Sequence, residues 1–465
     1  MSLKRNLMML LSGLLVPLHF LPSTVAALVD TLPFALIAYY PTMAYVGHLG
    51  RDGAPQFAFV LLAAVGWWLA RRERGAVDQG VPTFGSAGRL TSTERKIRRR
   101  IFTTLAALSS AVTLPRDEGD GVTRTACEID RATLDAWSAP YRGWHYFPTA
   151  IIPSDHAIPG HEKFQNFDVP TVYQIPGQTG TWFMSYIGFD GAGYNSFVAE
   201  STDLVRWTNP RLAMGFGKEG EFDFGGCVVG AYLYETYDVK APRLLKKRDG
   251  RFWTLYGCYA KQGGYELDPG YEGVANSDDG LTWRRAQDRY ILSIHEPEVG
   301  EWEKHCIYQP WLVEHEGRFL NFYNAKHMPD WIEQMGMATS RDLLTWKRHA
   351  DNPIIRVRPG GYDEKFCADG KVFRDGDHWV MFYFGVGRGG AHIMAAFSRD
   401  LLHWTAHPEP LYRAGGHPGG LDTTYAHKIS LVYHPGNDTY YLHYCAVGTA
   451  GRIIALITSR PLSGT

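Results

Sequence analysis

One seven-residue sequence recurs along the chain and constrains its fold more than any other feature. Residues 398–404 read Ser-Arg-Asp-Leu-Leu-His-Trp, and residues 340–346 and 201–207 carry nearly the same heptad. A looser copy lies at 277–283 and a shorter remnant at 459–462, so that successive serines stand 76, 63, 58 and 61 residues apart. Repeats of roughly 50 residues are typical of four-stranded propeller blades. Five copies therefore predict five blades.

Each repeat also contains the same succession of short strands. A strand with a small or polar start is followed by a turn and by an aromatic strand that ends in Tyr, as in 369–373 and 379–383. No long helical periodicity follows Trp144. The sequence predicts an all-β, five-bladed β-propeller over residues 144–465. Because the heptad recurs in every blade, we interpret its Asp as fastening a turn and its Trp as packing between blades.

The chain before the propeller has a different composition. Residues 1–75 contain three apolar runs, the first of which is long enough to span a bilayer, and we interpret this segment as a membrane anchor or a miscalled N-terminal segment. Residues 76–115 are basic and contain Arg-Arg-Ile-Phe at 99–102, similar to a twin-arginine export signal. A basic amphipathic helix that links anchor to domain explains the same residues equally well. Residues 116–143 are polar and are interpreted as a linker.

These segments and the composition limit the location and the partners of the protein. We expect an exported protein, periplasmic or extracellular, with a membrane tether formed by its N-terminal segment. The 47 basic and 48 acidic residues give a net charge of −1, which offers no basic surface for nucleic acid. Six scattered cysteines without CxxC spacing do not predict a metal site, and no cofactor is required.

The heptads and the strand pattern that ends in Phe-Tyr at residues 382–383 resemble the five-bladed propeller glycosidases. These are glycoside hydrolase families 32, 43, 62 and 117 and the related family 130 phosphorylases. The resemblance covers roughly residues 145–465 and implies a carbohydrate substrate. It also implies that the innermost strand of each blade lines a central funnel and presents catalytic carboxylates near its start.

The starts of the five predicted innermost strands differ from one another and form the candidate site. They are Asp168, Lys240, Gln309, Asp369 and His427. Glycoside hydrolysis generally uses two carboxyl groups, one as a proton donor and one that activates water or attacks the sugar. The resemblance implies that Asp168 is the general base and that Asp369 orients the substrate.

The general acid has two candidates. Families 32 and 43 place a Glu where this chain has Gln309, and Glu303 lies just upstream. An acidic residue recurs near that position in four blades, which favours a structural role for Glu303. Family 117 relatives use a His as the acid, which makes His427 the second candidate. Family 43 relatives carry a fifth-blade His that binds water or calcium, so His427 is also compatible with a structural calcium.

Loop residues after the inner strands complete the predicted site. Together with the inner-strand residues Gln309 and Lys240, the candidates for substrate contact are Asp223, His327, Trp331 and Arg388. Trp331 is expected to stack on a sugar ring.

The predicted function is that of a glycoside hydrolase, with two main alternatives. A glycoside phosphorylase would need a basic cluster, for which Arg243, Arg388 and His392 are candidates. Gln309 in place of an acid suggests a non-catalytic carbohydrate-binding propeller instead. A sialidase-like propeller ranks last, because only the heptad at 277–283 approximates an Asp-box.

Overall fold

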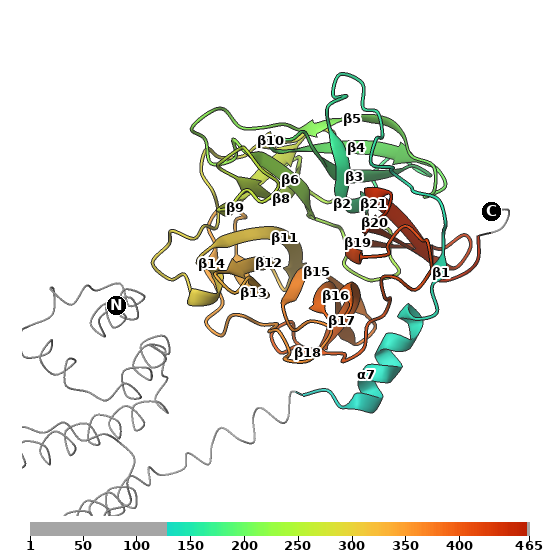
Figure 1. The fold of residues 1–465 in the computed structure, drawn as a ribbon. Helices are drawn as coiled ribbons and strands as arrows, with labels where there is room; N and C mark the ends of the chain where they lie inside the picture. Colours follow the sequence, from blue (N-terminus) through green and yellow to red (C-terminus); the bar gives the residue numbers. More distant parts are fainter. Residues whose placement is uncertain (1–127, 463–465) are drawn as a thin grey trace, which may run out of the picture. The chain divides into compact units, whose positions relative to one another are not determined.

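The computed structural model describes residues 128–462, which form an all-β propeller of five blades with a short helix at its start (Figure 1). The predicted anchor, export segment and first part of the linker lie outside these residues. Among residues 128–462, no helix is long and apolar enough to cross a membrane.

The strands are grouped into five antiparallel blades. Blade 1 contains β2 (Gln165–Tyr173), β3 (Trp182–Phe189), β4 (Tyr194–Ser201) and β5 (Thr208–Met214). Blade 2 contains β6 (Gly226–Tyr232), β8 (Arg251–Tyr259), β9 (Gly270–Ser277) and β10 (Arg284–Arg285), with β7 (Lys247–Arg248) beside β8. Blade 3 contains β11 (Cys306–His315), β12 (Arg318–His327), β13 (Ile332–Ser340) and β14 (Lys347–Arg348), preceded by the 3-10 helix η3 (Glu301–Glu303). Blade 4 contains β15 (Phe366–Asp375), β16 (His378–Gly387), β17 (Gly390–Ser398) and β18 (Thr405–Ala406).

The last blade closes the ring with a strand from the start of the domain. Blade 5 contains β19 (Tyr425–His434), β20 (Thr439–Gly448) and β21 (Gly451–Thr458), and its outer strand is β1 (His145–Tyr146). The pairing of His145 with Thr458 joins the two ends of the propeller. Because the first strand completes the last blade, both ends are held in the same sheet.

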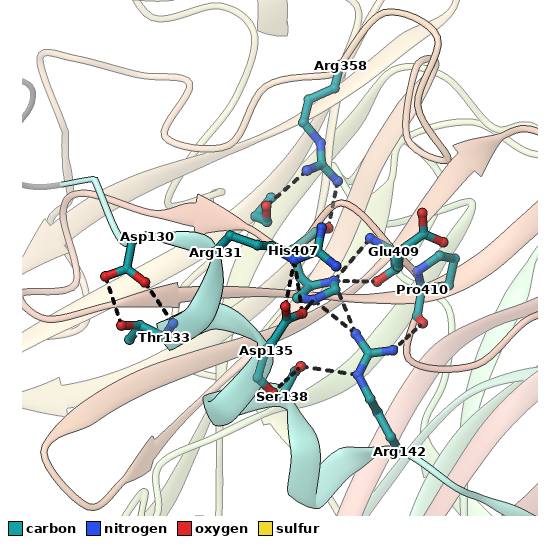
Figure 2. A network of polar contacts seen from close by, with 11 residues as sticks. Asp130, Arg131, Thr133, Asp135, Ser138, Arg142, Arg358, His407, Glu409 and Pro410 are labelled. Atoms are coloured by element: carbon teal, nitrogen blue, oxygen red, sulfur yellow. Dashed lines mark hydrogen bonds and ion pairs between the residues drawn. The ribbon is translucent and has the colours of Figure 1, made fainter.

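Part of the predicted linker, 116–143, is folded against blade 4. Helix α7 (Arg131–Ser138) is followed by the 3-10 helix η2 (Ala139–Tyr141). Trp137 stacks on His378 with ring centroids 3.9 Å apart. Figure 2 shows Asp135 of α7 hydrogen-bonded to His407 at 2.9 Å. The helix therefore belongs to the propeller domain, and the linker ends before it.

The heptads form turns, as their repetition predicted. The Asp203 carboxylate accepts the backbone N–H groups of Val205 and Arg206 at 2.9 and 2.7 Å, and the Ser201 hydroxyl accepts that of Leu204 at 2.9 Å. Asp279, Asp342 and Asp400 make the equivalent bonds in the other three complete heptads. Each Asp thus closes a turn by satisfying backbone donors.

The innermost strand of blade 2 is β6, and the prediction that it starts at Lys240 is wrong. Residues 233–246 form an insertion between β6 and β7, and Lys240 is exposed within it. The insertion crosses to blade 4, where Val239 N–H donates to Arg374 O at 2.8 Å. The buried Arg243 guanidinium holds it in shape by donating to backbone carbonyls, including Val239 O at 3.0 Å.

This insertion contacts the C-terminal ends of the inner strands. Arg374 lies near the end of β15, Glu314 near the end of β11 pairs with Lys246, and Gln174 N–H just after β2 donates to Arg243 O. The insertion therefore closes one end of the central funnel.

A buried carboxyl group outside the funnel makes the stability of the fold dependent on pH. Glu272 of β9 is fully buried, and its only hydrogen-bond donor among the described residues is the side-chain amide of Asn321. Burial raises the pKa of Glu272 to about 8. The native state thus keeps a proton that the unfolded chain releases above pH ~4.5.

We expect Glu272→Gln to remove this pH dependence. The free energy of unfolding of the wild type should fall between pH 5 and pH 8, whereas the variant should lack that loss. The difference should reach about 4 kcal/mol near pH 8, since one pKa unit corresponds to about 1.4 kcal/mol. Denaturant unfolding curves at both pH values measure it, and parallel pH dependence in the two proteins would contradict a protonated Glu272.

Candidate active site

A cavity of about 390 Å³ lies where the N-terminal ends of the inner strands meet. Five of the predicted site residues line it: Asp168, Gln309, Trp331, Asp369 and His427. The cavity is at the end of the funnel opposite to the insertion 233–246, because its lining comes from the first residues of β2, β11, β15 and β19.

A bulge shapes the inner strand of four blades at this level. Val169, Gln309, Asp369 and Lys428 have φ values of 51°, 55°, 54° and 52°, in the left-handed region that such residues rarely adopt. The register with the next strand shifts at each of these positions. Asp168 therefore stands one position before the bulge, as His427 does, whereas Asp369 stands on the bulge itself.

Asp168 is an ionised carboxylate held by two cations. Lys428 Nζ and Arg452 Nη1 each donate to Asp168 Oδ2 at 2.7 Å, and Val169 N–H donates to Oδ1 at 2.8 Å. Burial alone would raise the pKa of Asp168, but Lys428, Arg452 and His427 together lower it well below its ordinary value. The two donors occupy both lone pairs of Oδ2. This leaves Asp168 poorly suited to accept a proton from water.

His427 is a neutral imidazole without a proton to donate into the cavity. Its Nδ1 lies 2.9 Å from Cys445 O, and a carbonyl oxygen can only accept, so Nδ1 carries the hydrogen. Nε2 then accepts from Arg452 Nη1 at 3.2 Å. Burial, opposed by Asp168 and reinforced by Lys428 and Arg452, lowers the pKa of His427 to about 3. This geometry opposes the predicted role of His427 as general acid.

The same cluster does not fit a metal ion. Asp168, His427 and Cys445 offer ligand atoms within 4.8 Å of one another. Arg452 Nη1, however, lies 2.7, 3.2 and 3.6 Å from these three atoms and occupies the place where a cation would sit. Calcium also prefers oxygen ligands over a thiol and an imidazole. The structure thus gives no support to a calcium site at His427.

Asp369 has the most available carboxylate oxygen in the cavity wall. Lys371 Nζ donates to Asp369 Oδ1 at 2.7 Å. Oδ2 is buried and has no hydrogen-bond partner among the described residues. A buried oxygen without a partner is costly, and a substrate hydroxyl or a water molecule would satisfy it.

Glu333 is a buried carboxyl group in the cavity that the sequence reasoning missed. Trp331 Nε1 donates to Glu333 Oε1 at 2.8 Å, and Asn324 Nδ2 donates to Oε2 at 3.1 Å. Burial raises the pKa of Glu333 above its ordinary value, although hydrogen bonds from Tyr308, Trp331 and Asn324 oppose the shift. Glu333 is therefore the cavity carboxyl group most inclined to keep a proton.

The position of Glu333 could have been found from the repeat. Glu333 lies seven residues before Ser340, the first residue of its heptad. The same offset in other blades gives Tyr194, Ala391 and Arg452, which also line the cavity. The second and third inner positions of a blade thus both carry site residues, whereas the sequence reasoning used only the innermost strand.

The rim of the cavity combines a tryptophan with a charged cluster. Trp331 is 38% exposed and presents a ring face near the mouth. Lys326 Nζ lies 4.6 Å from the centre of this ring and pairs with Glu266 and Asp268 at 2.9 and 3.0 Å. These residues suit a sugar ring, which stacks on aromatic faces and bonds to polar groups at its edge.

Two predicted site residues belong instead to a structural motif that recurs between blades. Glu303 accepts from Tyr323 Oη at 2.7 Å and from Arg348 Nε at 3.0 Å. Asp223 accepts in the same way from Tyr256 and from Arg285. Asp363 repeats the pattern with Tyr383 and Arg358. None of these carboxylates lines the cavity. Glu303 and Asp223 are therefore corrected to structural residues.

The other predicted contact residues lie outside the cavity lining. His327 Nδ1 donates to Glu301 O at 2.8 Å, and Arg388 is exposed. The basic residues expected for a phosphorylase are also elsewhere. Arg243 is buried in the insertion, and His392 Nδ1 accepts from Ala414 N–H at 3.1 Å.

No family model and no curated protein matches this sequence. Among solved structures, a glycoside hydrolase matches with 26% identity and a TM-score of 0.63, over 73% of this chain and 97% of its own. A structure described as a complex of BT0996 and RGII matches with the same values. A structure reported with the GH130 mannoside phosphorylases and glycoside hydrolases that target β-1,2 mannosidic linkages in Candida mannan matches with 14% identity and a TM-score of 0.50, over 69% of this chain and 95% of its own. This last likeness concerns the fold alone.

Proposed function

We propose that this chain, a glycan-active member of the five-bladed propeller glycosidase superfamily, hydrolyses a glycosidic bond with Glu333 as the general acid and Asp369 as the second carboxyl group. Glu333 would protonate the leaving oxygen. Asp369 would activate a water molecule or attack the anomeric carbon. This assignment replaces Glu303 and His427 as candidate acids and Asp168 as candidate base.

The observation that carries the proposal is the difference between the two carboxyl groups in one cavity. Burial favours the protonated form of Glu333. Asp369 instead has a lysine on one oxygen and, among the described residues, no partner on the other. Two carboxyl groups whose surroundings favour different protonation states suit an acid and a base acting together.

The shape of the funnel supports the removal of a terminal sugar. The insertion 233–246 closes the end opposite to the cavity, so that a glycan would enter by one mouth. Trp331 lies at that mouth and could stack on the sugar next to the cleaved bond. An exo-acting enzyme needs only such a one-ended pocket.

The first experiment separates hydrolysis from phosphorolysis. The purified protein is incubated with a glycan panel, which includes the RGII glycan named for a relative with 26% identity, in buffers with and without inorganic phosphate. We expect release of a free reducing sugar without phosphate. A sugar phosphate formed only in its presence would assign a phosphorylase, and glycan binding without any product would assign a binding protein.

The pH dependence of the reaction should depend on Trp331. Because Glu333 must be protonated, kcat/KM should fall on the alkaline side as Glu333 loses its proton. The Trp331 N–H group favours the carboxylate form, so Trp331→Phe should raise the pKa of Glu333 and move the alkaline limb upward. A hydrogen bond of about 1 kcal/mol corresponds to a shift of about 0.7 pH units. An unchanged or lower alkaline limb would contradict the role of Glu333, while Trp331→Ala tests stacking through KM.

A further inference from the structure

Two cations in the cavity wall have more hydrogen-bond donors than the described part of the protein uses. Lys428 of β19 and Arg452 of β21 both line the cavity, and each side chain is 17% exposed. Within residues 128–462, Lys428 Nζ contacts only Asp168. Arg452 uses only Nη1, so that Nε and Nη2 have no acceptor among the described residues. A guanidinium has five N–H groups and an ammonium three, so most of these donors are available to a ligand.

The charge of this cluster is unbalanced. Asp168 supplies one negative charge against two positive ones, and His427 is neutral. Burial raises the pKa of the Cys445 thiol, so Cys445 adds no charge.

Elsewhere in the cavity the cations have their own carboxylates. Lys326 pairs with Glu266 and Asp268, and Lys371 pairs with Asp369. The excess of positive charge is therefore confined to blade 5, next to the proposed site of bond cleavage.

We propose that Lys428 and Arg452 form a subsite for a small oxyanion, either the carboxylate of an acidic sugar or inorganic phosphate, and that Asp168 is the positioning residue that holds both cations in place. Arg452 can offer two parallel N–H groups to such a group, which is the strongest geometry for a carboxylate or phosphate. The Tyr265 ring, 5.0 Å from the guanidinium carbon, fixes the plane of Arg452. The proposal rests on the function proposed above, since it places the oxyanion in the same cavity.

Binding to a full-length Glu333→Gln protein tests the subsite without turnover. Calorimetry compares glucuronate, inorganic phosphate and glucose, the last as the neutral match of glucuronate. We expect glucuronate or phosphate to bind at least about tenfold more tightly than glucose, as one charge-assisted hydrogen bond allows. Tighter glucuronate binding assigns a sugar carboxylate, and tighter phosphate binding assigns phosphate. No preference of either anion over glucose overturns the proposal.

Variants of the cluster separate an anion site from simple packing. Added to that protein, Lys428→Met should weaken anion binding about tenfold, while Lys246→Met, at the far end of the funnel, should not. Lys428→Arg keeps the charge and should keep the affinity.

The decisive variant is Asp168→Asn. It removes the competing negative charge and should strengthen anion binding several-fold, an effect that neither a general base nor a packing residue would produce. Unchanged or weaker binding in a protein with an unaltered thermal midpoint overturns the proposal. Because these readouts are affinities, a lack of hydrolysis in the wild type would refute the proposed reaction without touching this result.

Discussion

Glu333→Gln should reduce kcat/KM for a natural glycan by about 10²- to 10⁴-fold, the usual contribution of a general acid. Gln keeps the shape of the side chain and can still accept from Trp331 Nε1, which donates to Oε1 at 2.8 Å in the native protein. It cannot donate the proton that the leaving oxygen requires. Initial rates with the glycan identified from the panel measure the loss.

The leaving group provides the control for this prediction. A glycoside of a nitrophenol needs little protonation when its bond breaks, so Glu333→Gln should lose much less activity on it than on the natural glycan. An equal loss on both substrates would mean that Glu333 supports binding or folding and not proton transfer.

Asp369→Asn should abolish turnover almost completely, by about 10³- to 10⁶-fold, as expected when a nucleophile or its equivalent is removed. The amide oxygen can still accept from Lys371, which lies 2.7 Å from Asp369 Oδ1. The thermal midpoint should therefore change little. The measurement is kcat on the same glycan, and full activity would remove Asp369 from the mechanism.

Rescue of Asp369→Ala by azide gives this prediction a second readout. A small anion can enter the space left by the carboxylate and react with the anomeric carbon when the leaving group is good. The configuration of the resulting glycosyl azide then shows whether Asp369 attacks the sugar or activates water. Absence of rescue, together with full activity of Asp369→Asn, would place the second carboxyl group elsewhere.

The blades could be predicted from sequence because each heptad is a local structure. The turn at Asp203 depends on backbone donors two and three residues away, so its signal survives in every copy. The position of Lys240 could not be predicted in the same way. The insertion 233–246 contains short segments that resemble a strand start, and only its long-range contacts with Arg374 and Gln174 show that it crosses the funnel.

The site was predicted in part. Asp168, Gln309, Trp331, Asp369 and His427 do line the cavity, but their roles depend on contacts between blades. Lys428 and Arg452 come from the end of the chain to pair with Asp168, a contact that no local pattern indicates.

The protonation of buried carboxyl groups was also beyond the sequence. Glu303 and Glu333 are both buried acidic residues of the third blade region. Glu303 has Arg348 as a partner, whereas Glu333 accepts hydrogen bonds from neutral donors, and the difference appears only in three dimensions.

The comparison of Glu333→Gln with Glu303→Gln tests the account most directly, because the two residues are matched in type and burial. We expect Glu333→Gln to lose turnover at an unchanged thermal midpoint. Glu303→Gln should retain kcat but lower the free energy of unfolding by about 3 kcal/mol, since it breaks a buried ion pair. Full turnover in Glu333→Gln, or loss of turnover in a well-folded Glu303→Gln, would contradict the assignment of the cavity as the active site.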